Sequence, residues 1–128
     1  MSIRLIAGVR NAQIMENEMS ELESYKYKIQ QIVDEVNNSI RSFEEELSVI
    51  PSYISIPINE EKGEFLEWNK YESGRKWLLT RSYYKATPVE ELSFEDKQLI
   101  VSKYMDKFKE EALKTIQRLI KNHGEQNE

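Results

Sequence analysis

One long stretch decides the fold, residues 12–50: AQIMENEMSELESYKYKIQQIVDEVNNSIRSFEEELSVI. Its seam positions alternate steps of three and four residues: Ala12, Met15, Met19, Leu22, Lys26, Ile29, Val33, Val36, Ile40, Phe43, Leu47 and Ile50. Only Lys26 interrupts the apolar pattern, and the stretch contains neither proline nor glycine. A heptad repeat of this kind predicts one α-helix, about 58 Å long at 1.5 Å per residue.

The ends of this helix follow from its flanking residues. Pro51 cannot continue a helix, so the helix is expected to end before it, and its start is expected near Asn11. Two alternatives remain for the preceding residues. A start near Ser2 is compatible with the register of the seam, and residues 3–9 could instead form a short strand.

Residues 53–84 change to a different periodicity. Ile54, Ile56 and Ile58 alternate with polar residues or proline, which indicates a strand, and the neighbouring prolines place it at a sheet edge. Residues 65–71 and 76–84 are rich in aromatic residues and are joined by residues 72–75, which suit a hairpin turn. The segment therefore predicts a three-stranded antiparallel meander, or a two-stranded hairpin with an extended lead-in.

A second helical segment is predicted over residues 88–123. Thr87 and Pro88 resemble a helix start, Ser93 offers a second N-cap, and residues 121–124 resemble a C-terminal end, with residues 124–128 as a frayed tail. Its main apolar stripe is Val101, Met105, Phe108, Ala112, Ile116 and Leu119. The predicted fold class is α+β, mostly helical, in a single domain over residues 1–128 with the C-terminal helix packed on the first.

Composition narrows the setting of the protein. The chain has no cysteine, which excludes disulfides and thiolate chemistry and suits a reducing compartment. No stretch has the length of a transmembrane helix, and the apolar patch at the N-terminus is too short for a signal peptide. We therefore expect a cytoplasmic protein without a membrane partner. Residues 12–50 carry nine acidic and three basic side chains, which argues against binding of nucleic acid by that helix.

The positions beside the heptad seam indicate its partner. None of them is basic, so a helix paired with its own copy over residues 12–50 would gather like charges. Residues 94–123 carry seven basic against five acidic residues and can complement the first helix. We expect a homodimer built as a helical bundle, with a monomeric helical hairpin capped by its sheet as the alternative. The expected packing and oligomer seam is Met15, Met19, Leu22, Ile29, Val33, Val36, Ile40, Phe43 and Leu47.

Residues that could carry catalysis are scarce. His123 is the only histidine, it lies near a predicted helix end, and no phosphate-binding glycine motif or metal-ligand spacing occurs. Glutamate runs such as residues 44–46 are typical of solvated helix faces. The sequence therefore predicts a non-enzymatic protein with no catalytic residue, cofactor or metal.

The predicted hairpin has the most distinctive surface. Five basic residues and one acid lie between residues 70 and 86, with aromatic residues among them. The candidate contacts to a partner or to nucleic acid are Lys70, Arg75, Lys76, Arg81, Tyr84 and Lys85. Core packing is nevertheless the stronger expectation for Trp68 and Trp77, because alternation splits the aromatic residues between the two faces of the strands.

Three functions are compatible with these patterns. The first is a protein-interaction module, such as an adaptor, assembly factor or inhibitor, that self-associates through its helices and binds another protein. The second is a nucleic-acid-associated protein that uses the basic and aromatic hairpin. The third, weaker hypothesis is an acidic mimic of nucleic acid that blocks a basic site on its partner.

Overall fold

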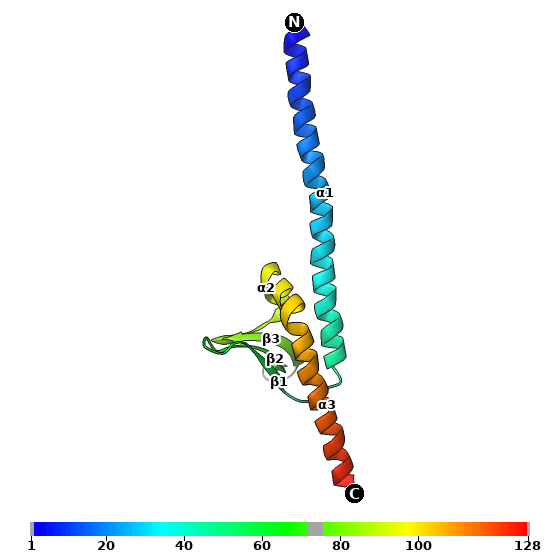
Figure 1. Ribbon diagram of the computed structural model, residues 1–128, viewed down its shortest axis with the longest axis vertical. Coiled ribbons are helices and arrows are strands. Elements are labelled where there is room, and N and C mark those ends of the chain that lie inside the picture. Colours follow the sequence, from blue (N-terminus) through cyan, green and yellow to red (C-terminus); the bar gives the residue numbers. More distant parts are fainter. Residues whose placement is uncertain (1, 72–75, 128) are drawn as a thin grey trace. The chain divides into compact units, whose positions relative to one another are not determined.

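The computed structural model describes residues 2–71 and 76–127, with side chains described within residues 20–71 and 76–125 (Figure 1). The helices and strands, in chain order, are α1 (Ser2–Leu47), β1 (Ile54–Asn59), β2 (Glu64–Tyr71), β3 (Lys76–Tyr83), β4 (Lys85–Pro88), the 3-10 turn η1 (Val89–Glu91), α2 (Phe94–Leu99), the π-helical segment η2 (Ile100–Tyr104) and α3 (Met105–Asn127). The chain divides into an N-terminal unit, Met1–Glu35, and a C-terminal unit, Val36–Glu128, each described by itself below. One domain over residues 1–128 stays a prediction.

Helix α1 differs from its predicted bounds at both ends. It begins at Ser2, the longer of the two starts considered, so the alternative of a strand over residues 3–9 is wrong. It ends at Leu47 instead of Ile50, because the chain turns there. The Ile50 N–H donates to the Leu47 carbonyl at 2.9 Å, and the Ser48 hydroxyl donates to the Glu45 carbonyl at 2.6 Å.

The sheet has four antiparallel strands in the order β1-β2-β3-β4, one more than the predicted meander. The additional strand, β4, pairs with β3 through Arg81 opposite Thr87 and Thr80 opposite Pro88. A short helical turn does start here, but one residue later than predicted: Thr87 and Pro88 belong to β4, and the 3-10 turn η1 begins at Val89 with Pro88 as its N-cap. Pro88 ends an edge strand, where the missing N–H is tolerated. The predicted turn at residues 72–75 lies outside the described residues.

The C-terminal helical segment begins at the second of the two predicted caps. The Ser93 hydroxyl accepts the backbone N–H of Asp96 at 3.2 Å, and α2 follows. The π-helical segment η2, which no sequence signal indicated, joins α2 to α3. Helix α3 continues through Gly124 to Asn127, so the predicted end near residue 123 is wrong, and residues 125–127 of the predicted tail belong to the helix.

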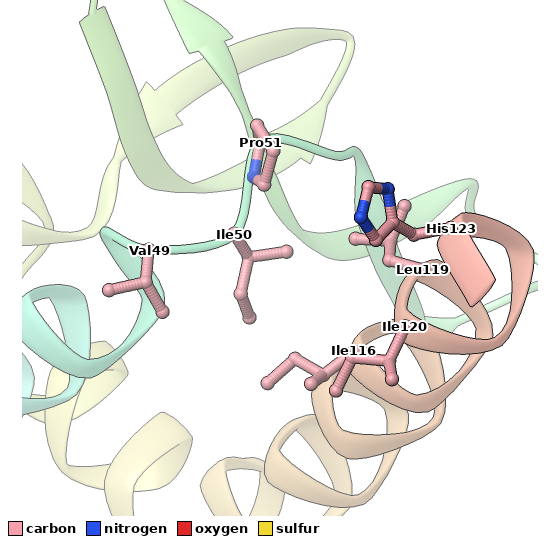
Figure 2. A pocket seen from close by; sticks show the side chains of 7 residues that line it. All are labelled: Val49, Ile50, Pro51, Ile116, Leu119, Ile120 and His123. Atoms are coloured by element: carbon pink, nitrogen blue, oxygen red, sulfur yellow. The ribbon is translucent and has the colours of Figure 1, made fainter. Parts of the chain in front are cut away.

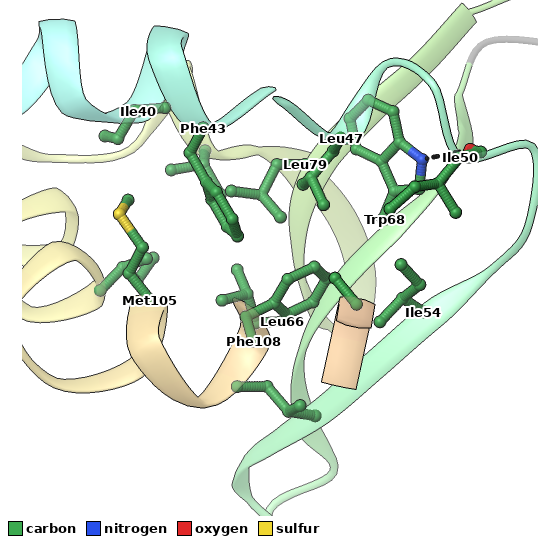
Figure 3. Close-up of a cluster of buried hydrophobic side chains, with 14 of the residues drawn as sticks. Ile40, Phe43, Leu47, Ile50, Ile54, Leu66, Trp68, Leu79, Met105 and Phe108 are labelled. Atoms are coloured by element: carbon green, nitrogen blue, oxygen red, sulfur yellow. Dashed lines mark hydrogen bonds between the residues drawn. The ribbon is translucent and has the colours of Figure 1, made fainter. Parts of the chain in front are cut away.

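The core of the C-terminal unit lies between the last turns of α1, helix α3 and one face of the sheet (Figure 3). The rings of Phe43 and Phe108 meet edge to face, with centroids 5.7 Å apart. The indole N–H of buried Trp68 donates to the Ile50 carbonyl at 3.0 Å and ties β2 to the chain that leaves α1. This arrangement confirms the α+β class, with a long first helix, an antiparallel sheet and a long last helix.

Candidate interaction surfaces

The heptad seam of α1 has a buried part in the C-terminal unit. Val36, Ile40, Phe43 and Leu47 are all buried, as is Ile50 beyond the end of the helix. They pack with core residues of α3 and the sheet, such as Phe108, which confirms the predicted packing of the last helix on the first. This half of the seam therefore stabilises the fold of a single chain.

The same seam has an exposed part in the N-terminal unit. Leu22 is 66% exposed and Ile29 is 54% exposed, although both occupy seam positions. Two apolar residues beside the seam, Tyr25 and Ile32, are also exposed, at 61% and 37%. Val33 is half-buried, and the side chains of Met15 and Met19 lie outside the described residues. We call Leu22, Tyr25, Lys26, Ile29 and Ile32 the exposed stripe.

Charged groups flank this stripe. The Lys26 ammonium lies 3.7 Å from a carboxylate oxygen of Glu23, one turn earlier, and both side chains are more than 70% exposed. The Gln30 amide donates to Asp34 at 3.1 Å. Exposed pairs of this kind contribute little to stability, so they leave the apolar side chains as the dominant feature of the surface.

The opposite charges of the two long helices indicated the last helix as the partner of the first, and in the structure apolar side chains make the contact between them. Within the described residues, no ion pair joins α1 to α3. In this part of the chain, two contacts between α1 and the C-terminal helices involve charged side chains. The Lys97 ammonium, in α2, donates a hydrogen bond to the Asn37 amide oxygen at 3.1 Å, and the Lys109 ammonium, in α3, lies 5.7 Å from the centre of the Phe43 ring. Apolar burial, which stabilises proteins in proportion to the area removed from water, holds these helices together.

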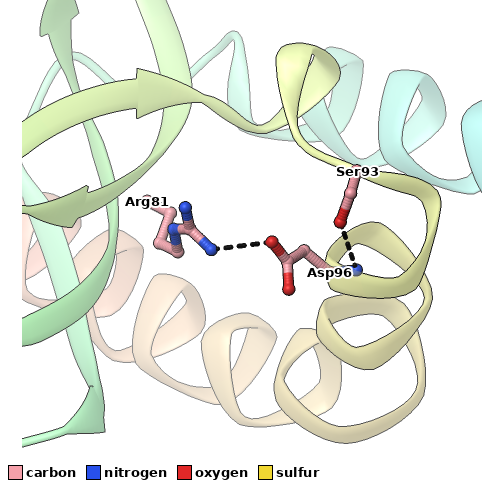
Figure 4. A network of polar contacts seen from close by, with 3 residues as sticks. All are labelled: Arg81, Ser93 and Asp96. Atoms are coloured by element: carbon pink, nitrogen blue, oxygen red, sulfur yellow. Dashed lines mark hydrogen bonds and ion pairs between the residues drawn. The ribbon is translucent and has the colours of Figure 1, made fainter.

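One of the basic residues predicted as hairpin contacts is paired with an acidic residue of its own chain. Arg81 is bound to Asp96 at 2.9 Å (Figure 4). The Lys70 ammonium lies 5.7 Å from the centre of the Trp77 ring, and Lys76 and Lys85 are exposed. Arg75 lies outside the described residues. The structure therefore leaves fewer cations for a phosphate backbone than the sequence count suggested.

Tyr84 is almost completely exposed. Its side chain is 94% exposed, and its backbone φ of +63° lies in the left-handed region, which residues with a side chain rarely adopt. Its ring meets that of Tyr83 with centroids 4.5 Å apart. The turn between β3 and β4 thus displays an aromatic ring on a strained backbone.

Sequence reasoning missed a polar site at Glu44. This residue was predicted to belong to a solvated helix face, but its Oε2 accepts the backbone N–H of Leu79 at 3.4 Å. Its Oε1 is buried without a hydrogen-bond partner among the described residues. Glu44 borders a pocket of about 340 Å³ together with Trp68, Trp77, Lys76 and Glu90. The two tryptophan rings are stacked, with centroids 5.9 Å apart.

The environment of Glu44 opposes its ionisation. Burial raises the pKa of its carboxyl group, and the negative charge of Glu90 raises it further, whereas the Leu79 N–H and the charge of Lys76 act in the opposite direction. A carboxyl group with a raised pKa binds its proton more tightly in the folded state. Its contribution to the free energy of unfolding is therefore complete below the unfolded pKa and is lost as the pH rises through the folded pKa.

We therefore expect Glu44→Gln to stabilise the protein more at pH 7 than at pH 4. Glutamine keeps an acceptor for the Leu79 N–H and removes the ionisable carboxyl group. The check is the urea midpoint of both proteins at the two pH values. Glu46→Gln is the matched control, because it removes an exposed carboxylate from the same turn of α1. A Glu44→Gln effect that is identical at both pH values would contradict the assignment.

A second pocket in the C-terminal unit is apolar. Its volume is about 420 Å³, and Figure 2 shows its lining side chains, which come from the chain after α1 and from the last turns of α3: Val49, Ile50, Pro51, Ile116, Leu119, Ile120 and His123. Val49 is 77% exposed and Ile120 is 67% exposed. The sequence associated His123 only with a helix end, whereas it borders this apolar groove.

Two other kinds of site are absent from the described part of the chain. Among the residues that the structure describes, no helix is both long and apolar enough to cross a membrane. In the same part of the chain, no group of three or more histidine, cysteine, aspartate or glutamate residues is placed to hold a metal ion. Comparisons with protein-family models, with curated proteins and with solved structures found no match.

Proposed function

We propose that this chain is a small, non-enzymatic protein-interaction module of the cytoplasm that self-associates as a homodimer through α1. One observation carries the proposal. Helix α1 exposes apolar surface at Leu22, Tyr25, Ile29 and Ile32, whereas from Val36 onwards the seam of the same helix is buried in a core. Scattered apolar residues are normal on a surface, but a contiguous apolar patch usually marks an interaction site.

Pairing of two stripes would bury these residues as the core buries Val36 and Ile40. A single amphipathic helix gains most of its stability from such packing, because isolated helices are marginal in water. Residues 2–35 of α1 therefore favour a partner helix, and a second copy supplies one with the same heptad spacing.

Self-association leaves the C-terminal unit to bind another protein, as an adaptor, an assembly factor or an inhibitor does. The apolar groove beside Ile120 and the exposed ring of Tyr84 are the surfaces that support this part of the proposal. The alternative of nucleic-acid binding has less support, because Arg81 is already bound to Asp96. No feature of the described acidic residues favours the mimic of nucleic acid.

Sedimentation velocity of the full chain tests the proposal. Between about 1 and about 200 μM, a range that spans affinities typical of weak and moderate dimers, the mass should rise towards twice the chain mass of 15.2 kDa. A mass that stays at one chain over the whole range would contradict self-association.

A further inference from the structure

The charges at the centre of the exposed stripe restrict how two copies can pair. Lys26 occupies a seam position, and its ammonium lies 3.7 Å from Glu23 of the same chain. In a parallel pair, each seam residue faces its own copy, so two lysines would meet at the centre of the contact. Like charges held in an apolar seam are repelled and lose their hydration, which disfavours this orientation.

The spacing of the seam residues fits the opposite orientation. When the second helix is reversed about residue 24, the seam positions match in pairs whose residue numbers are symmetric about 24. Leu22 then faces Lys26 of the other copy, and by sequence register Met19 faces Ile29 and Met15 faces Val33. Each of these layers except the two central ones, in which Leu22 faces Lys26, therefore consists of two apolar residues.

Neighbouring antiparallel registers are poorer. A shift of the dyad by half a heptad towards the C-terminus sets Met19 and Met15 opposite Val36 and Ile40, which are already buried in the C-terminal unit, whereas the register about residue 24 sets only the small residues Ala12 and Gly8 opposite them. The equivalent shift towards the N-terminus sets Val33 opposite Gly8, which has no side chain to cover it. Only the register about residue 24 pairs the four seam residues Met15, Met19, Ile29 and Val33 with one another.

On these grounds we propose that the homodimer pairs the exposed stripes of two α1 helices in antiparallel orientation, with the two-fold axis beside Ser24. In this arrangement Glu23 and Lys26 of the two copies meet at the axis, and the four charges cancel. Each Lys26 then has a carboxylate from both chains within its reach, and the two Tyr25 rings flank the axis. The inference depends on the self-association proposed above and adds its orientation and register.

Spin labels provide a direct test, because the chain has no cysteine and a single introduced cysteine is the only labelling site. Ser24, Gln31 and Asn38 are exposed, and they lie one heptad apart on the helix face opposite the seam. The three variants are Ser24→Cys, Gln31→Cys and Asn38→Cys, each measured as the full chain at a concentration where sedimentation shows a dimer. Circular dichroism compares their helix content with that of the parent.

The proposal predicts distances that increase from Ser24 to Gln31 to Asn38. Two copies of residue 24 lie level along the axis, whereas copies of residue 38 are separated along it by about 42 Å, from 1.5 Å per residue. After the common lateral offset between the two helices is included, the distance at residue 38 should exceed that at residue 24 by about 20 Å.

Each other result has a distinct meaning. Equal distances at all three positions would show a parallel pair and overturn the proposed orientation while leaving self-association intact. Equal distances at residues 24 and 31, with a longer distance at residue 38, would overturn the proposed register, because the two-fold axis would then lie midway between residues 24 and 31. If no concentration gives a dimer, the proposed function fails, and the orientation fails with it.

Discussion

Replacement of Phe108 by alanine is expected to lower the free energy of unfolding of the C-terminal unit by about 3–5 kcal/mol, the usual cost of removing a buried phenylalanine. Phe108 has no exposed surface and meets Phe43 edge to face in the middle of the core. Residues of helix α1 and of the sheet surround this side chain. The cavity that alanine would leave therefore cannot be filled by the movement of a single residue. This cost is a large fraction of the stability of a small domain.

Urea denaturation followed by tryptophan fluorescence measures the effect, because Trp68 and Trp77 are the only tryptophans and both lie in the C-terminal unit. Leu113→Ala is the matched control. Leu113 belongs to the same helix but is 57% exposed, so its truncation should cost less than about 1 kcal/mol, as surface substitutions do. A Phe108→Ala cost as small as that of the control would contradict the described core.

Ile29→Asp is expected to abolish dimer formation while leaving the C-terminal unit folded. A dimer contains two copies of Ile29, and burial of each isoleucine side chain contributes about 1.5–3 kcal/mol. The loss of both side chains alone should therefore raise the dissociation constant of the dimer at least about a hundredfold. The introduced carboxylates add the cost of placing charge in an apolar contact. Because Ile29 is more than half exposed in the single chain, its replacement breaks no core contact.

The equivalent substitution seven residues later should behave differently. Val36 occupies the same kind of seam position but is only 8% exposed, within the C-terminal unit. Val36→Asp should therefore lower the urea midpoint of that unit, whereas Ile29→Asp should leave it unchanged. A shared loss of folding in both variants would show that the seam has one role along its length, in contradiction to the division between a buried and an exposed part.

The long elements were predictable from the sequence because their signals are periodic over many residues. The heptad from Leu22 to Leu47 predicts a helix whether its partner belongs to the same chain or to another. Ser93 predicts a helix start because its side chain forms a local hydrogen bond. Strand β4 was missed because Thr87 and Pro88 are equally typical of a helix start, and only pairing with β3 decides between them. The segment η2 depends on how the helix packs and has no pattern of its own.

The candidate surfaces were less predictable for a related reason. A heptad pattern does not distinguish a seam that faces its own chain from one that remains exposed, and this distinction separates Ile40 from Ile29. Glu44 belongs to a run of three glutamates, and only the approach of β3 gives its carboxylate the Leu79 N–H. The sequence alone gives no sign that Arg81 is paired, because its partner Asp96 is brought close only by the fold.

Sedimentation equilibrium of the parent chain, Ile29→Asp and Gln31→Asp at one concentration tests the central claim, self-association through the exposed stripe, most directly. Both variants gain one negative charge at an exposed position of α1, but only Ile29 belongs to the stripe, whereas Gln31 lies on the opposite helix face. The predicted result is a dimer for the parent and for Gln31→Asp, and a monomer for Ile29→Asp. A dimer of undiminished affinity for Ile29→Asp, or a monomer for the parent, would contradict the claim.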